Sequence, residues 1–286
     1  MSRIAYVNGR YIPHQDAAVH IEDRGYQFAD GVYEVIAVHN GHLVDADRHM
    51  KRLERSLKEL QIDPPMGDAA LLHVMQETIR RNTVRHGIVY LQITRGVAPR
   101  DHKFPKYAVS SVVVTAKRVR PMARALIEKG VPVITIPDIR WLRRDIKSIS
   151  LLPNCLGKQQ AAQAGAFEAW MVDSEGYVTE GTSTNAWIID AKGVLRTRKA
   201  THVILNGITR MALVDIAAAQ GIPFDEKPFT VDEAKTAREA FISSTGVFVL
   251  PVTSIDKSLV GKGAPGPVAT ALRQAYVAEF TPEHPV

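Results

Sequence analysis

Residues 88–116, IVYLQITRGVAPRDHKFPKYAVSSVVVTA, place two strand-like runs on either side of a polar loop. The runs, Ile88–Arg95 and Val109–Ala116, are rich in the β-branched residues that favour strands. Arg100 and His102 lie between them, two residues apart, and point the same way if the backbone is extended. A guanidinium fork with a second nitrogen donor suits the binding of a small carboxylate. The stretch therefore predicts a sheet that carries a carboxylate-binding loop.

The sequence before this stretch combines hairpin signals with helical repeats. Asn8-Gly9 and Asn40-Gly41 each interrupt an apolar run, as in tight β-hairpins. Apolar residues recur at helical spacing over Asp45–Leu60 and again over Asp68–His86. We therefore expect residues 1–119 to form a small α+β domain, with helices packed against a mostly antiparallel sheet.

The second half of the chain begins after a proline-containing segment, residues 120–125. We interpret this segment as a linker, because proline removes a donor from any strand ladder. Residues 126–286 are expected to form a larger domain. Its predicted strand-like runs are Val131–Ile136, Ala166–Asp173, Tyr177–Glu180, Ala186–Asp190 and Phe241–Val252. Its predicted helices are Asn154–Gly165, Thr209–Gln220 and Pro267–Phe280.

The composition is that of an ordinary globular protein, with 45% hydrophobic and 23% charged residues. The net charge of +6 is spread over mixed-sign segments, which disfavours nucleic-acid binding and suits an anionic small molecule. The single cysteine, Cys155, excludes an internal disulfide. There is no signal-peptide pattern and no run near the roughly 18 apolar residues of a membrane span. We expect a cytoplasmic protein that binds neither membrane nor nucleic acid.

Lys147 and Glu180 are the candidates for chemistry. Lys147 lies in the partly apolar run DIKSIS (145–150), and a partly desolvated amine is suited to Schiff-base formation. A surface lysine and a turn glutamate are the alternatives for the two residues taken singly. A carboxylate beside a pyridine nitrogen would keep that nitrogen protonated, and the hydroxyls of residues 182–184 could contact the ring or a phosphate. With the carboxylate clamp, this pattern favours amino-acid chemistry on pyridoxal phosphate.

Three segments could hold the phosphate of such a cofactor. Gly207-Ile208-Thr209-Arg210 opens a predicted helix with Thr209 as its N-cap, and a helix N-terminus offers free amides and a positive dipole. Ser243–Gly246 could add hydroxyl and amide donors. Arg52, beside the apolar stripe of the first helix, could bring the countercharge; a solvated helix face is its alternative.

Five ordered segments resemble the fold-type IV pyridoxal-phosphate transaminases, and most closely the bacterial D-amino acid transaminases. The similarity runs nearly end to end. The segments are EDRGYQFADGVYEV (22–35), TRGVAPRDHKFP (94–105), DIRWLRRDIKS (138–148), VTEGTSTN (178–185) and ILNGITR (204–210). The resemblance implies an α+β fold, with a small N-terminal α/β sandwich and a larger C-terminal domain that has a β-barrel-like core.

The resemblance also implies a role for each matching residue. Lys147 matches the lysine that binds the cofactor and moves the proton, and Glu180 matches the glutamate paired with the pyridine nitrogen. The residues that match further cofactor contacts are Arg52, Leu205, Ile208, Thr209, Ser244 and Thr245. Those that match the trap for the substrate α-carboxylate are Tyr33, Arg100 and His102. In this family the arginine and histidine come from the neighbouring subunit, so we expect a homodimer with the active site at the subunit interface.

Two departures from the family pattern concern specificity and cofactor affinity. Gly246-Val247 follows Ser244-Thr245 where relatives carry hydroxyl residues. Thr184 takes a place that serine often holds near the substrate side chain. Neither departure touches the residues implied in the reaction.

The resemblance implies a two-step amino transfer between D-amino acids, such as D-alanine and D-glutamate, and 2-oxo acids. Branched-chain aminotransferase and aminodeoxychorismate lyase share the fold, but the combination of Tyr33 with Arg100 and His102 resembles the D-enzyme clamp. A non-catalytic relative would be expected to lose Lys147 or Glu180. A nicotinamide dehydrogenase rests only on GKGAPG (261–266), which lies too near the end of the sequence for a βαβ unit.

Overall fold

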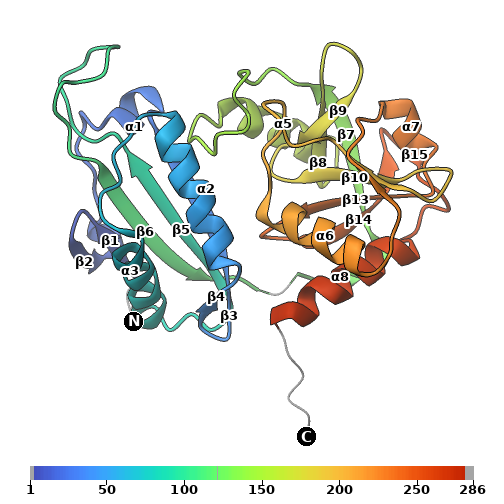
Figure 1. Ribbon diagram of the computed structural model, residues 1–286, viewed down its shortest axis with the longest axis horizontal. Coiled ribbons are helices and arrows are strands. Elements are labelled where there is room, and N and C mark those ends of the chain that lie inside the picture. The colour runs from blue at the N-terminus through green and yellow to red at the C-terminus, as the bar shows by residue number, and fades with distance from the viewer. Residues whose placement is uncertain (1–2, 121, 281–286) are drawn as a thin grey trace, which may run out of the picture. The chain divides into compact units, whose positions relative to one another are not determined.

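The computed structural model describes residues 3–120 and 122–280. The chain divides into two compact units, which we describe separately (Figure 1). The first unit comprises Met1–Arg120 and Ile146–Ser150, and the second comprises Pro121–Asp145 and Leu151–Val286. No helix in the described ranges is long and apolar enough to cross a membrane.

The first unit is built on a six-stranded antiparallel sheet with the strand order β2-β1-β6-β5-β3-β4. Its strands are β1 (Ile4–Val7), β2 (Arg10–Pro13), β3 (Gly31–His39), β4 (His42–Leu43), β5 (Gly87–Thr94) and β6 (Ser111–Arg118). Both predicted hairpins are confirmed. Asn8 and Gly9 have φ of 43° and 92°, and Asn40 and Gly41 have φ of 49° and 84°. Positive φ at both central residues is the signature of a two-residue hairpin turn.

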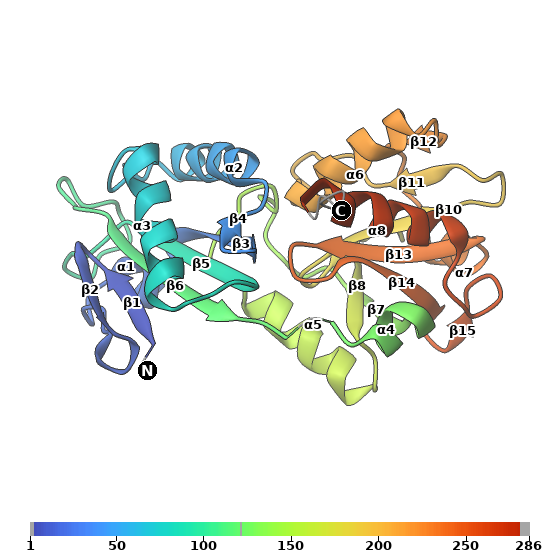
Figure 2. The same ribbon diagram turned by 90° about the horizontal axis from the view of Figure 1, so that it is seen from below.

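Two helices cover one face of this sheet (Figure 2). They are α2 (Ala46–Glu59) and α3 (Asp68–Arg81), and their buried side chains include Met50, Leu53, Leu57, Leu71, Met75 and Ile79. The prediction for α3 ran too far, to His86. The helix ends at Arg81 because Thr83 adopts a left-handed φ of 48° and the Val84 amide bonds back to the Ile79 carbonyl. The remaining helices of this unit are a 3-10 turn, η1 (His14–Asp16), and α1 (Arg24–Phe28).

Residues 146–150 join the first unit by pairing with the open edge of β3. The short strand β4 pairs only with Val38 and His39, which leaves the start of β3 unpaired on that side. The Tyr33 amide donates to the Lys147 carbonyl at 3.0 Å, and the Ile149 amide donates to the Gly31 carbonyl at 3.1 Å. The segment that carries Lys147 therefore packs with strands far earlier in the sequence, because unpaired edge amides and carbonyls need partners.

The second unit contains a nine-stranded mixed sheet that curls so that β9 lies beside β10. The order is β12-β11-β10-β13-β14-β7-β8-β9, and β15 pairs with β14. The strands are β7 (Val131–Pro137), β8 (Glu168–Val172), β9 (Val178–Gly181), β10 (Asn185–Ile189), β11 (Leu195–Thr197), β12 (Phe224–Asp225), β13 (Glu239–Ser244), β14 (Phe248–Ile255) and β15 (Ser258–Leu259). The helices are α4 (Arg124–Lys129), α5 (Leu152–Gln163), α6 (Ile208–Ala219), α7 (Val231–Lys235) and α8 (Pro267–Phe280).

Some predicted element bounds in this unit differ from the structure. The run Phe241–Val252 is a hairpin of two strands, since the chain reverses at Thr245–Val247. The helix predicted over Asn154–Gly165 begins two residues earlier, at Leu152. The last residues of the predicted linker 120–125 already belong to α4, while Pro121 lies outside the described residues. The domain boundaries at 119 and 126 stay a prediction.

The core of the second unit has two parts. On one side, Trp187 and Phe241 stack with ring centroids 5.4 Å apart, beneath the buried faces of α6 and α8. On the other, Trp170 packs against Phe229 within a separate cluster. Burying such aromatic rings provides much of the driving force for folding this unit.

The first testable prediction concerns Gly96, at the start of the loop that carries Arg100 and His102. Gly96 has φ +92°, and a Cβ added there would overlap the backbone oxygen of Val109. Gly96→Ala should therefore lower the free energy of unfolding by roughly 2 kcal/mol or more. Urea denaturation measures the change. Gly67→Ala is the control, because Gly67 has an ordinary φ of −68° and open space, and it should cost under about 1 kcal/mol. Equal losses in the two variants would contradict the prediction.

Candidate active site

Lys147 and Tyr33 are brought together within the first unit. The Lys147 Nζ lies 4.2 Å from the centroid of the Tyr33 ring, and the Lys147 side chain is half-buried. The backbone pairing with β3 fixes this approach, and the Lys147 amide donates to the Ser56 Oγ at 3.3 Å. The ring face attracts an ammonium group. Two of the residues predicted from the sequence thus meet, although they are more than a hundred positions apart.

Arg52 is held by a buried carboxylate that the sequence analysis did not identify. Its Nε and Nη2 donate to the two oxygens of Glu34 at 2.8 and 2.7 Å. The Nδ1 of buried His49 lies 2.7 Å from Glu34 Oε2. Such a forked pair fixes the plane of the guanidinium. Arg52 is therefore oriented by Glu34 rather than lying on the solvated helix face that was its alternative.

The charges of this cluster follow from its burial and its arginine. Burial alone raises the pKa of Glu34, but the Arg52 guanidinium and the hydrogen bonds outweigh it and bring the pKa to about 2. Burial lowers the pKa of His49, although its bond to Glu34 acts in the opposite direction. Glu34 is thus ionised at neutral pH and His49 is neutral, which makes its Nδ1–H the donor to Glu34.

Arg100 and His102 lie on the loop between β5 and β6 and contact Phe28. The Arg100 guanidinium is 4.6 Å from the centroid of the Phe28 ring, and the His102 ring is 5.5 Å from it. Buried Arg24 donates to the Asp101 carbonyl at 2.6 Å and so anchors the loop. In the described ranges, no hydrogen bond or ring contact links either residue to Tyr33. The contacts of one chain therefore do not assemble the predicted carboxylate trap.

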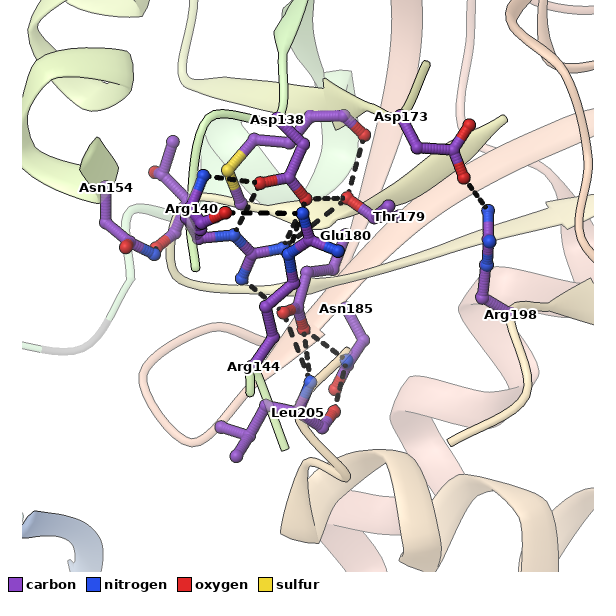
Figure 3. Close-up of polar contacts among 12 residues, drawn as sticks. Asp138, Arg140, Arg144, Asn154, Asp173, Thr179, Glu180, Asn185, Arg198 and Leu205 are labelled. Carbon is purple, nitrogen blue, oxygen red and sulfur yellow. Dashed lines mark hydrogen bonds and ion pairs between the residues drawn. The ribbon is translucent and has the colours of Figure 1, made fainter. Parts of the chain in front are cut away.

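Glu180 lies in β9, where it is buried and contacts several polar groups (Figure 3). Arg140 Nη1 donates to its Oε1 at 2.5 Å, and Asn185 Nδ2 donates to Oε2 at 3.1 Å. The Leu205 amide reaches both oxygens, at 3.1 and 3.2 Å. Arg140 is itself held by Asp138, with contacts of 3.0 and 2.8 Å. The structure thus places Glu180 beside Leu205 and adds an arginine and an aspartate that sequence reasoning missed.

Burial and the Arg140 charge act in opposite directions on Glu180. Burial is the larger influence and raises the pKa of Glu180, while the Arg140 guanidinium and the Leu205 amide lower it. Arg140 stays charged, because the carboxylates of Glu180 and Asp138 raise its pKa despite burial. The carboxyl group therefore sits where a further positive partner would favour its ionised form.

The start of α6 fits a phosphate group. Gly207, not Thr209 as predicted, is the N-cap, since Gly207 has extended dihedral angles and Thr209 is already helical. The Thr209 Oγ1 is buried and has no hydrogen-bond partner in the part of the chain that the structure describes. The first amides of a helix also lack partners within the helix. An unpaired hydroxyl beside such amides, at the positive end of the helix dipole, is a site for an anion.

Ser244 and Thr245 lie at the turn between β13 and β14, directly after Ser243. Ser243 pairs with Asn185 across the sheet, and the Asn185 amide donates to the Leu205 carbonyl at 2.9 Å. A Cβ added at Gly207 would meet the Asn185 side chain. The turn and the start of α6 therefore flank one residue, Asn185. Within the described ranges the hydroxyls of Ser244 and Thr245 make no hydrogen bond, so both could donate to an anion such as a phosphate group.

The hydroxyls that follow Glu180 have a different partner from the one expected. Thr182 Oγ1 and Ser183 Oγ both donate to fully buried Glu168, the latter at 3.1 Å. Thr184 Oγ1 lies 3.4 Å from the same carboxylate. These donors are directed to Glu168 rather than to a ring or a phosphate. Glu168 was missed because it lies within an otherwise apolar strand run.

Comparison with known proteins points to one family. The family model described as amino-transferase class IV matches residues 31–255. The chain is 44% identical to a D-alanine aminotransferase of Bacillus licheniformis over 95% of this chain and 96% of that protein. It is 41% identical to a D-alanine aminotransferase of Listeria monocytogenes serotype 1/2a, over 96% of this chain and 95% of that protein.

Solved structures show the same fold. A branched-chain amino acid aminotransferase solved with pyridoxamine 5'-phosphate superposes with a TM-score of 0.91 at 27% identity, covering 100% of this chain and 96% of that one. The branched-chain enzyme from Escherichia coli superposes with a TM-score of 0.89 at 25% identity, covering 100% and 96%. The predicted fold class is confirmed.

The second testable prediction concerns Glu34. Because its folded pKa of about 2 is below its ordinary value of 4.5, it contributes stability above pH 4.5 that is lost as the pH falls toward 2. The contribution is roughly 3 kcal/mol. Glu34→Gln should lower the unfolding free energy at pH 7 by a similar amount, and the difference from wild type should shrink in acid. Urea denaturation across this pH range measures both.

Glu77→Gln is the matched control for Glu34→Gln. Glu77 also has a pKa lowered to about 2, by hydrogen bonds to Arg80 and Arg81, but these arginines are exposed on the surface of α3. Exposed ion pairs contribute little, so the control should be far closer to wild type. A Glu34 variant no less stable than the Glu77 variant would show that the buried cluster does not stabilise the fold.

Proposed function

The chain belongs to the class IV aminotransferase family, and we propose that it is a D-amino acid transaminase. It would move amino groups between D-amino acids, such as D-alanine and D-glutamate, and 2-oxo acids. The observation that carries this proposal is the match of 44% identity, nearly end to end, with a D-alanine aminotransferase. The branched-chain aminotransferases superpose well but are at most 27% identical among the structures described above, so they support the fold more than the substrate.

Pyridoxal phosphate, when bound, supplies a conjugated ring that withdraws electrons from the substrate α-carbon. We assign its covalent attachment to Lys147, whose half-buried Nζ would also accept the α-proton and return it to the product. Glu180 would hold the proton on the ring nitrogen, and Leu205 would pack against the ring. The phosphate would be bound by Arg52, Ile208, Thr209, Ser244 and Thr245. The unpaired Thr209 hydroxyl at the start of α6 supports this assignment.

Arg140 has a clear part in this scheme. Without it, a buried Glu180 would tend to be neutral, since burial raises its pKa. The guanidinium offsets part of that effect, and a protonated ring nitrogen beside Glu180 would lower its pKa further and favour the carboxylate. Asp138 forms a second ion pair with Arg140 and so also compensates the guanidinium charge. Together, the three residues would hold the charged groups near the ring nitrogen in position before the substrate binds. These groups would then not need to rearrange during the reaction.

The substrate α-carboxylate would be held by Tyr33 of one subunit and by Arg100 and His102 of its neighbour, in a homodimer. The contacts of Arg100 and His102 with Phe28, rather than with Tyr33, support a trap shared between chains. If the substrate is held mainly by its carboxylate, the site discriminates weakly between substrate side chains. We therefore expect a broad range of D-amino acids to be accepted. A cytoplasmic location also stays a prediction.

The third testable prediction concerns the reaction. Purified protein with pyridoxal phosphate should transfer the amino group of D-alanine to 2-oxoglutarate far faster than that of L-alanine, as pyruvate formation measures. Lys147→Ala should be inactive. Glu180→Gln should keep the cofactor yet turn over roughly two to three orders of magnitude more slowly, because the charge contact at the ring nitrogen is lost. Preference for L-leucine or L-alanine would instead favour the branched-chain activity, and release of pyruvate from aminodeoxychorismate, whose substituent on the carbon next to the α-carbon can leave, would favour the lyase.

The fourth testable prediction concerns the shared trap. Lys147→Ala and Arg100→Ala should each be nearly inactive as homodimers. After subunit exchange at equal amounts, half of the dimers would be mixed and each would hold one intact site, so about a quarter of wild-type activity should return. A tag on each variant verifies the exchange. No recovery in verified mixed dimers would mean that the trap is built within one chain.

A further inference from the structure

The turn between β13 and β14 holds an aromatic residue in an unfavourable backbone conformation. Ser244 pairs with Phe248, and the Val247 amide donates to the Ser244 carbonyl at 3.3 Å. Phe248, the next residue, has φ +59°, a left-handed conformation that glycine usually takes at this place in a hairpin. The neighbouring Gly246 does not use a positive φ. A bulky residue in this region is a genuine outlier that the surroundings must maintain.

Arg273, in α8, binds the backbone on both sides of this residue. Its Nη1 donates to the Val247 carbonyl at 2.7 Å and to the Val249 carbonyl at 2.5 Å. Holding the Val247 and Val249 carbonyls to one nitrogen restrains the backbone dihedral angles of the residues between them, Phe248 included. In the described ranges Arg273 has no carboxylate partner, and burial lowers its pKa. Keeping a partly buried cation without a counter-ion is costly, so carbonyls must take the place of water.

An aromatic cluster attaches the same turn to the end of α8. The Phe248 ring lies 5.6 Å from Tyr276 and 5.2 Å from Phe280, both edge to face. Tyr276 and Phe280 are 5.3 Å apart, in the same kind of contact. Such pairs add to the burial of the rings. The last helix therefore holds the turn by its backbone through Arg273 and by its side chain through this cluster.

We propose that Arg273 is a positioning residue for the cofactor phosphate. By binding the carbonyls that flank Phe248, it keeps the turn in the conformation in which Ser244 and Thr245 face their ligand. This inference rests on the proposed function, in which those two residues bind the phosphate of pyridoxal phosphate. Arg273 itself does not contact the cofactor; it acts through the shape of the turn.

The fifth testable prediction separates the phosphate from the rest of the cofactor. The full-length enzyme, freed of cofactor, is titrated with pyridoxal phosphate and, separately, with pyridoxal, which lacks the phosphate; quenching of tryptophan fluorescence gives each Kd. Arg273→Met should raise the Kd for pyridoxal phosphate about tenfold, because the donors leave their places. The Kd for pyridoxal should stay within about twofold of wild type. The control is Gln274→Ala, at the exposed neighbouring position on α8, which should change neither value.

A second measurement tests whether Arg273 acts through the turn. If it does, adding Arg273→Met to a Ser244→Ala, Thr245→Val protein should weaken phosphate-dependent binding little further, since the affected donors are already gone. Full additivity would overturn the inference, and so would equal weakening of pyridoxal and pyridoxal phosphate by Arg273→Met. Should that variant fail to fold, the same ratio is measured on Arg273→Lys, which keeps the charge. A wild type that binds no pyridoxal phosphate would overturn the proposed function itself, whereas normal phosphate-dependent binding in the folded Arg273 variants would overturn the inference alone.

Discussion

The backbone pairing of residues 146–149 with the open edge of β3 is the constraint on which the arrangement around Lys147 depends. Two hydrogen bonds, to Tyr33 and Gly31, hold a segment that lies between two stretches of the second unit in the sequence. They set the Lys147 amine against the Tyr33 ring. They also place it within electrostatic reach of His49 and hence of the cluster that orients Arg52. Main-chain pairing thus positions the Lys147 side chain, which sequence propensities alone would predict to lie on the surface.

Each unit places an arginine against a buried glutamate, with different results for the pKa of the carboxyl group. Glu34 receives a forked pair from Arg52, and its pKa falls to about 2. Glu180 is also buried, but it shares Arg140 with Asp138, so burial dominates and its pKa rises. The same residue pairing therefore makes one carboxylate a fixed anchor. The pKa of the other carboxyl group, that of Glu180, can still be lowered by a further positive neighbour. This property suits a contact to a protonated ring nitrogen.

Local signals predicted a large part of the fold. The Asn-Gly turns at residues 8 and 40 need only two residues to specify them, and both hairpins form as predicted. The apolar residues whose spacing predicted α2 and α3 are also the ones whose side chains pack in the core. Errors arose where a few residues decide an end: Thr83 stops α3 early, and Gly207 takes the N-cap position expected for Thr209.

The partners of the candidate site were harder to predict, because they depend on contacts between distant segments. Periodicity along α2 shows that Met50, Leu53 and Leu57 are buried, but it does not show that Glu34 of β3 meets Arg52. Arg140 and Glu180 are forty positions apart, and Glu168 and Ser183 are fifteen apart; only the sheet brings them together. One signal was available: a charged residue within an apolar strand run, as at Glu34 and Glu168, indicates a buried partner.

The late position of residues 146–150 in the sequence has a consequence for synthesis. All six strands of the first sheet have been synthesised by residue 118. The segment that closes the edge of β3 emerges from the ribosome only after residues 121–145. Until then the nascent sheet exposes unpaired amides and carbonyls, a template on which another chain can add a strand. Once it has emerged, the segment proposed to attach the cofactor therefore also closes this edge to the addition of a strand from another chain.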